Sequence, residues 1–144
     1  AIAKPSAIEV IVKSIKSSNI YFPNLIAPNV IFFDKNNISL GRGNIISFGC
    51  SISCNVHIGN FNILNCCILV GHDTKIGDYN AIMPSTNISG NVTMGERNFL
   101  GVSSVILEKL TIGNDTTIGA NSLIFRNTKD KNTYIGNPAS IVKL

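Results

Sequence analysis

Aliphatic residues recur at every sixth position along most of the chain, with mainly polar or small residues between them. A period of six fits neither the 3.6-residue repeat of an α-helix nor the two-residue alternation of an ordinary half-exposed strand. It is typical of a coiled chain in which each hexad contributes one short strand and one corner. The series runs through Leu40, Ile46, Ile52, Ile58, Leu64, Val70, Ile76, Ile82, Ile88, Met94, Leu100, Ile106, Ile112, Ile118 and Ile124.

Two other positions of the hexad support this interpretation. The residue after the aliphatic one is often glycine, which permits tight turns and close backbone approach; these glycines are Gly41, Gly59, Gly71, Gly77, Gly95, Gly101, Gly113 and Gly119. Four residues after the aliphatic one, small or β-branched side chains suit a narrow interior: Cys50, Val56, Thr74, Thr86, Val92, Ser104, Thr116, Ser122 and Thr128.

Three hexads complete one triangular coil, and successive coils stack at the inter-strand spacing of about 4.8 Å. Residues that are three hexads apart are therefore predicted to lie in one column. The register runs without a slip from Leu40 to Lys129, and residues 26–39 are predicted to form one imperfect coil before it. The pattern predicts an all-β parallel β-helix but does not give its hand.

The amino-terminal segment follows a different pattern, since its apolar residues have helical spacing. We expect a short amphipathic α-helix over residues 6–18, with Ser6 and Glu9 forming a capping box and Asn19 marking its end. Two roles are open for this helix. It either covers the open end of the β-helix, as repeat proteins require, or is the last helix of a preceding domain.

Composition agrees with a single all-β domain, because the 144 residues contain 44% hydrophobic but only 14% charged residues. No apolar run approaches the ~20 residues of a membrane-spanning helix, and no secretory signal is visible. The net charge of +4 lacks a dense Lys/Arg run. We therefore expect a cytoplasmic protein that binds neither membrane nor nucleic acid. Because the chain begins with Ala1, we also expect that an amino-terminal piece is missing.

The chain contains the four cysteines Cys50, Cys54, Cys66 and Cys67. They include no Cys-x-x-Cys pair, and the two adjacent ones are awkward for a simple bridge, so we expect free thiols and no metal site. Cys50 occupies an interior position of its hexad and is expected to be buried.

Residues 65–77 read NCCILVGHDTKIG and residues 89–92 read SGNV. This segment resembles sugar acetyltransferases that modify sialic acid or amino-sugar nucleotides, including sialic acid O-acetyltransferases and bacillosamine-type N-acetyltransferases. The resemblance covers residues 20–144. It implies a left-handed β-helix, a homotrimer, acetyl-CoA bound as co-substrate between subunits, a sugar or nucleotide-sugar acceptor, and a role in cell-surface polysaccharide biosynthesis.

The resemblance also assigns catalytic roles. His72 matches the general base that takes a proton from the acceptor amine or hydroxyl, and Asp73 matches its acidic neighbour. Gly90 matches the residue whose backbone amide holds the acetyl carbonyl. The repeat supports this assignment independently, since Gly90 follows His72 by three hexads and must lie in the same column. Imidazole titrates near neutral pH and is well suited to act as the base.

The remaining assignments concern binding. Asn65 matches a polar residue of the acceptor pocket, while Gly136 and Pro138, in the closing segment GNPA, are assigned to the cofactor site. His57 lies outside the motif and is interpreted as a surface or interface residue. No metal ligand is assigned.

Two features depart from the family pattern. Ala81 stands where some N-acetyltransferases of this group carry a second histidine. The family also begins with a Rossmann-like domain, whereas residues 1–26 resemble only its last helix and strand, and residues 27–144 form the acyltransferase domain. The exact acceptor, N- or O-acetylation, and acetyl or longer acyl donors are therefore left open.

Other functions of similar folds fit less well. A carbonic anhydrase needs three histidine ligands for its zinc, and only His57 and His72 are present. The regular threonine ladder of ice-binding β-helices is absent, and the helical domain of serine acetyltransferases has no counterpart. A transferase for another small acceptor such as serine, or a non-catalytic scaffold, stays the alternative.

Overall fold

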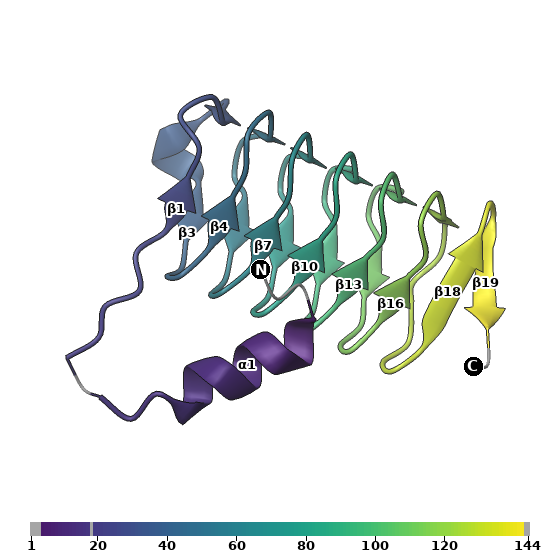
Figure 1. The fold of residues 1–144 in the computed structure, drawn as a ribbon. Helices are drawn as coiled ribbons and strands as arrows, with labels where there is room; N and C mark the ends of the chain where they lie inside the picture. Colours follow the sequence, from purple (N-terminus) through teal and green to yellow (C-terminus); the bar gives the residue numbers. More distant parts are fainter. Residues whose placement is uncertain (1–3, 18, 143–144) are drawn as a thin grey trace.

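The computed structural model describes residues 4–17 and 19–142, which form a β-helix with one α-helix beside it. Figure 1 shows the coils stacked along a single axis from β1 to the carboxyl-terminal hairpin. Each coil contributes one strand to each of three parallel sheets, so the predicted parallel β-helix is confirmed.

Sheet A is the front sheet in Figure 1 and has the strand order β1-β4-β7-β10-β13-β16-β18-β19. Its strands are β1 Leu25–Ile26, β4 Ile45–Ile46, β7 Ile63–Leu64, β10 Ala81–Ile82, β13 Phe99–Leu100, β16 Thr117–Ile118, β18 Thr133–Gly136 and β19 Ala139–Val142. The last two strands pair antiparallel and form a hairpin, whereas the preceding pairs of this sheet are parallel.

Sheets B and C form the other two sides. Sheet B contains β2 Ile31–Phe32, β5 Ser51–Ile52, β8 Leu69–Val70, β11 Asn87–Ile88, β14 Val105–Ile106 and β17 Leu123–Ile124. Sheet C contains β3 Ser39–Leu40, β6 His57–Ile58, β9 Lys75–Ile76, β12 Thr93–Met94 and β15 Thr111–Ile112. A 3₁₀ turn, Lys35–Asn37, lies between β2 and β3.

The register confirms the predicted columns. Leu64 pairs with Ile82 one coil on, and Ile82 pairs in the same way with Leu100. The aliphatic positions of the hexads are all buried from Ile46 to Ile124. Because β1 pairs with β4, residues Leu25 and Ile26 already belong to sheet A of the β-helix. The assignment of residues 1–26 to the end of a preceding domain stays a prediction.

The interior also contains a column of asparagines that the sequence interpretation missed. Asn44, Asn62, Asn80 and Asn98 are fully buried and follow one another coil by coil. The side-chain oxygens of the first three accept the backbone N–H of the next member, at 2.9 Å from Asn62, 2.8 Å from Asn80 and 2.9 Å from Asn98, and the oxygen of Asn98 accepts from the N–H of Thr116 at 2.7 Å. The column satisfies backbone groups that the corner would otherwise bury without partners.

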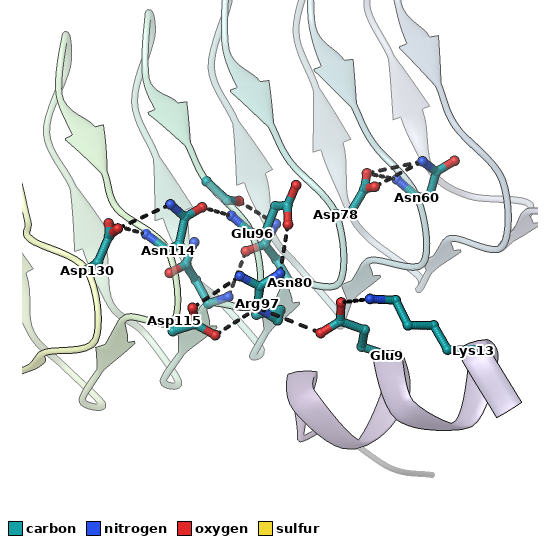
Figure 2. A network of polar contacts seen from close by, with 12 residues as sticks. Glu9, Lys13, Asn60, Asp78, Asn80, Glu96, Arg97, Asn114, Asp115 and Asp130 are labelled. Atoms are coloured by element: carbon teal, nitrogen blue, oxygen red, sulfur yellow. Dashed lines mark hydrogen bonds and ion pairs between the residues drawn. The ribbon is translucent and has the colours of Figure 1, made fainter.

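Three edges join the sheets. We call edge AB the corners that lead from sheet A to sheet B, edge BC those from B to C, and edge CA those from C back to A. At edge CA, corner side chains accept backbone N–H groups of the preceding coil. Asn60 Oδ1 accepts from Arg42 at 3.0 Å, Asp78 Oδ1 from Asn60 at 2.6 Å, and Asp130 Oδ1 from Asn114 at 2.8 Å. Figure 2 shows the last two of these contacts.

The helix α1, Pro5–Ser14, lies alongside edge CA, under the middle strands of sheet A in Figure 1. Arg97 holds it there. The guanidinium binds both oxygens of Asp115, at 2.8 and 3.2 Å, and lies 3.7 Å from the carboxylate of Glu9 on the helix (Figure 2). The Arg97 hydrogen bond lowers the pKa of Asp115. The helix therefore does not cover the first coil, and the interpretation of it as an end cap is wrong.

The predicted bounds of this helix are also wrong. The helix starts with Pro5, whose fixed φ favours the first helical position. Lys4 is therefore the N-cap residue, and its side chain makes no capping hydrogen bond. Ser6 therefore lies inside the first turn and does not form the expected capping box with Glu9. The helix ends at Ser14, since Ile15 is extended, and Asn19 lies beyond it.

The four cysteines are free in the structure, as expected, and Cys50 is buried. Its thiol donates to the carbonyl of Asn65 at 2.9 Å, and burial raises the pKa of this thiol. Among the described residues, no helix has the length and apolar character needed to cross a membrane.

We expect Asn80→Ala to lower the free energy of unfolding by about 2–3 kcal/mol, because the buried N–H of Asn98 loses its acceptor. The carbonyl of Gly95 also loses its donor, Asn80 Nδ2, at 3.0 Å. Urea unfolding followed by circular dichroism measures the change. The matched control is Asn87→Ala on the exposed side of β11, which should shift stability by less than about 0.5 kcal/mol. Equal effects of the two substitutions would show that the asparagine column does not stabilise the fold.

Candidate active site

His72 and Asp73 lie at a corner of edge BC, between β8 and β9. The corner is built by stacking: the N–H of Asp73 donates to the carbonyl of Cys54 on one side at 3.1 Å, and the carbonyl of His72 accepts the N–H of Asn91 on the other at 2.7 Å. Asp73 has a φ of 57°, in the left-handed region that aspartate tolerates better than most residues. These contacts fix the backbone from which both side chains project.

The two side chains hydrogen-bond to each other, with His72 Nδ1 lying 2.7 Å from Asp73 Oδ2. A carboxylate only accepts, so Nδ1 carries the proton and Nε2 is left with its lone pair when the ring is neutral. The hydrogen bonds from His72 and from Asn55 hold the pKa of Asp73 below its usual range. Asp73 therefore stays ionised at neutral pH, and His72 has the tautomer that a general base requires.

Gly90 lies directly against the imidazole, one coil further on. A Cβ atom on Gly90 would lie 2.5 Å from His72 Nε2 and 2.7 Å from Cε1. The ring therefore extends over this residue, with Nε2 facing it, and only glycine leaves room. The predicted column of His72 and Gly90 is found on edge BC, and Asp73, the neighbour of His72 in sequence, completes a compact group on the surface.

The N–H of Gly90 donates to no protein atom within residues 4–17 and 19–142. Edge CA differs, because the equivalent N–H groups of Asn60 and Asn114 are bound by Asp78 and Asp130 of the following coil. Gly90 thus offers a backbone donor next to His72 Nε2. A donor beside a base is the arrangement that stabilises an oxyanion formed during acyl transfer.

Asn65 lies on edge AB, so sheet B separates it from His72 within one chain. Its side-chain oxygen accepts the N–H of Cys66 at 2.9 Å. The structure of the single chain does not bring this predicted acceptor residue to the His72 group.

Gly136 and Pro138 lie at the turn of the β18–β19 hairpin, beyond the last complete coil. The N–H of Gly136 donates to Ser122 Oγ at 3.0 Å, and the Asn137–Pro138 peptide bond is cis. Between this hairpin and the last coil there is a pocket of about 470 Å³, whose lining includes Arg126 and Lys129. Arg126 lies on edge BC, three coils beyond His72 in the same column.

His57 is exposed on the outer side of sheet C, as predicted, with its Nδ1 2.5 Å from Ser39 Oγ. Within the described part of the chain, no group of three His, Cys, Asp or Glu side chains is placed to hold a metal ion.

Asn55 is a site residue that the sequence interpretation missed. Its Nδ2 donates to Asp73 Oδ1 at 2.6 Å. The signal was present, because Asn55 precedes Asp73 by the same three-hexad step that relates His72 to Gly90.

No protein-family model matches the chain, and no curated protein sequence matches it. Solved structures do match. A mutant of perosamine N-acetyltransferase from Caulobacter crescentus, in complex with CoA and GDP-perosamine, is 29% identical with a TM-score of 0.94, covering 99% of this chain and 67% of that one. WeeI from Acinetobacter baumannii AYE is 25% identical with a TM-score of 0.93 and covers 99% and 68%.

The acetyltransferase domain of PglB from Neisseria gonorrhoeae, in complex with acetyl coenzyme A, has a TM-score of 0.92 over 99% of this chain and 68% of that one. Its identity of 23% supports the shared fold alone. Fold and similarity together define the chain as an acyltransferase of the β-helix class, with the left-handed coil of those enzymes. The resemblance to hexapeptide-repeat sugar acetyltransferases that the sequence predicts is confirmed.

We expect Gly90→Ala to lower the rate of acetyl transfer by about 100-fold, because the added methyl group displaces the imidazole from its position. The backbone of Gly90 has no positive φ, so alanine should not prevent folding. Release of CoA thiol reports the rate. Circular dichroism and thermal unfolding serve as controls, and an active, normally folded Gly90→Ala protein would contradict the assigned geometry.

Proposed function

We propose that this protein transfers an acetyl group from acetyl-CoA to an amino or hydroxyl group of a sugar or nucleotide sugar, with His72 as general base. The observation that carries this proposal is the column on edge BC. There, Asp73 orients the imidazole of His72, and the imidazole faces Gly90, whose N–H has no acceptor among the described residues.

The chemistry follows from these groups. Nε2 of His72 accepts the proton of the acceptor amine or hydroxyl as the acceptor nitrogen or oxygen forms its bond to the thioester carbon. The N–H of Gly90 stabilises the negative charge that develops on the carbonyl oxygen. The tetrahedral intermediate collapses, the carbon–sulfur bond breaks, and the proton on Nε2 passes to the CoA thiolate. Asp73 stabilises the imidazolium that exists between the two proton transfers.

Edge BC also offers a route for the rest of CoA. Three coil steps of about 4.8 Å separate His72 from Arg126, a distance of about 14 Å along the column. Arg126 and Lys129 line the pocket beside the β18–β19 hairpin, where they would face the phosphates of CoA. The β19 residues Ala139 and Ser140 also line this pocket, whereas Gly136 is bound to Ser122 on edge AB. A contact of Gly136 and Pro138 with the co-substrate is therefore proposed from the family resemblance alone. Several of the similar solved structures contain CoA or acetyl coenzyme A.

The acceptor class rests on similarity. The Caulobacter crescentus enzyme is a perosamine N-acetyltransferase whose structure contains GDP-perosamine, a nucleotide sugar. We infer an acceptor of this class for the present chain. A role in cell-surface polysaccharide biosynthesis and a cytoplasmic location follow as part of the proposal, because acetyl-CoA and nucleotide sugars are both used there.

We propose that the active form is a homotrimer in which neighbouring chains complete the site. Edge AB supports this proposal, because its corners at 47–50, 65–68, 83–86, 101–104 and 119–122 contain no charged residue. Exposed apolar side chains of sheet B and its borders, such as Leu69, Val102 and Leu107, would be covered in such an assembly. Asn65 lies on this edge and would reach the His72 group of a neighbouring chain.

We expect His72→Ala to lower acetyl transfer by about 100- to 10,000-fold while acetyl-CoA affinity and the trimer are retained. Thiol release with a panel of amino and hydroxyl sugars, free and nucleotide-linked, measures transfer. Calorimetry with CoA measures affinity, and light scattering measures mass.

The matched control is His57→Ala, which alters the only other histidine, on sheet C, and should keep the parent rate. Equal rates for His72→Ala and the parent on a productive acceptor would contradict the mechanism. A monomeric but fully active parent would contradict the shared site.

A further inference from the structure

We propose that Asn55 is a positioning residue for the reaction, acting through Asp73 to hold the imidazole of His72 in its reactive tautomer and orientation. This inference rests on the proposed function of His72. The observation behind it is a continuous chain of hydrogen bonds across two stacked corners of edge BC.

The contacts meet at one carboxylate. Asn55 Nδ2 donates to Asp73 Oδ1 at 2.6 Å, and His72 Nδ1 donates to Asp73 Oδ2 at 2.7 Å. Each carboxylate oxygen therefore has its own donor, and the plane of the carboxylate is fixed from both ends. The imidazole in turn presents Nε2 to Gly90 on the far side.

A second anchor matters here because the group is open to solvent. The side chains of His72 and Asp73 are 59% and 49% exposed. The χ2 torsions of aspartate and histidine have broad energy profiles, so a carboxylate held by one bond would rotate and exchange partners with water. Asn55 removes this freedom. With Oδ1 bound to Asn55, Oδ2 of Asp73 stays directed at the Nδ1 hydrogen of His72 and is not exchanged between the imidazole and water.

The backbone places Asn55 for this contact. Asn55 and Asp73 have φ values of 54° and 57°, and both occupy the same left-handed position of successive corners. Asparagine is among the few residues that tolerate this conformation, and the bond between Asp73 N–H and Cys54 carbonyl keeps the two corners stacked. The carboxamide therefore needs no adjustment of the main chain to reach Asp73.

The test is Asn55→Gly, which removes the donor without straining a left-handed backbone. We expect three changes: His72 no longer holds a single neutral tautomer, Asp73 titrates at a higher pH than in the parent, and kcat falls about fivefold to tenfold with KM for acetyl-CoA unchanged. Nitrogen-15 shifts of the imidazole and carbon-13 shifts of the carboxyl report the first two. With only two histidines, the imidazole signals are readily assigned.

Two further variants sharpen the test. Asn55→Asp keeps the size of the side chain but replaces the donor by a second carboxylate, so it should disturb the tautomer at least as much as glycine does. Asn91→Gly changes the same corner position one coil on, where φ is 58°, and should leave both sets of shifts as in the parent.

Unchanged histidine tautomer and carboxyl titration in both Asn55 variants would overturn the proposal. The spectra are recorded without acetyl-CoA or acceptor. Failure of the Asn55 contact is therefore distinguishable from failure of His72 as the base, which only the transfer assay detects.

Discussion

The parallel register between coils is the constraint on which the rest of the structure depends. In sheet A, each strand residue from β4 to β13 pairs with the residue three hexads further on. Sheet B keeps the same step from β5 onward, and sheet C keeps it from β3 onward. A slip of one residue would turn the aliphatic column outward and bring polar strand residues inside. The same step brings His72 over Gly90 and Asn55 beside Asp73, so the proposed active site is a direct product of the stacking.

The edges of the β-helix use this stacking in different ways. At edge CA, side chains of one coil bind the backbone N–H groups of the previous coil, and Arg97 joins α1 to the same surface. At edge BC, Gly90 has no side chain to place over the previous corner, which leaves room for the imidazole of His72. Glu108, one coil beyond Gly90, binds Lys109 and leaves the N–H of Gly90 available. The corners of edges CA and BC thus differ mainly in their capping side chains.

The sequence was sufficient for the β-helix because its signal repeats in every hexad, and for the closeness of His72 and Gly90 because columns follow from the repeat. It was insufficient to predict the buried asparagine column of Asn44, Asn62, Asn80 and Asn98. An asparagine side chain is buried only when it has hydrogen-bond partners, and here the neighbouring coils supply them. The start of α1 was missed because the helix begins at Pro5, whereas the capping pattern of Ser6 and Glu9 predicted a start one residue later. The Asn55 contact depends on side-chain rotamers, which a periodic pattern does not contain. The proposed role of Asn65 depends on contacts with neighbouring chains, which a single sequence does not describe.

A crystal structure of the protein with acetyl-CoA tests the central claim most directly, namely that edge BC is the acyl-transfer site. We predict that the thioester carbonyl oxygen lies about 3 Å from the N–H of Gly90. The carbonyl carbon should lie beside His72 Nε2, and the diphosphate should run toward Arg126. Acetyl-CoA bound on sheet C or edge CA, with its thioester remote from His72, would contradict the account.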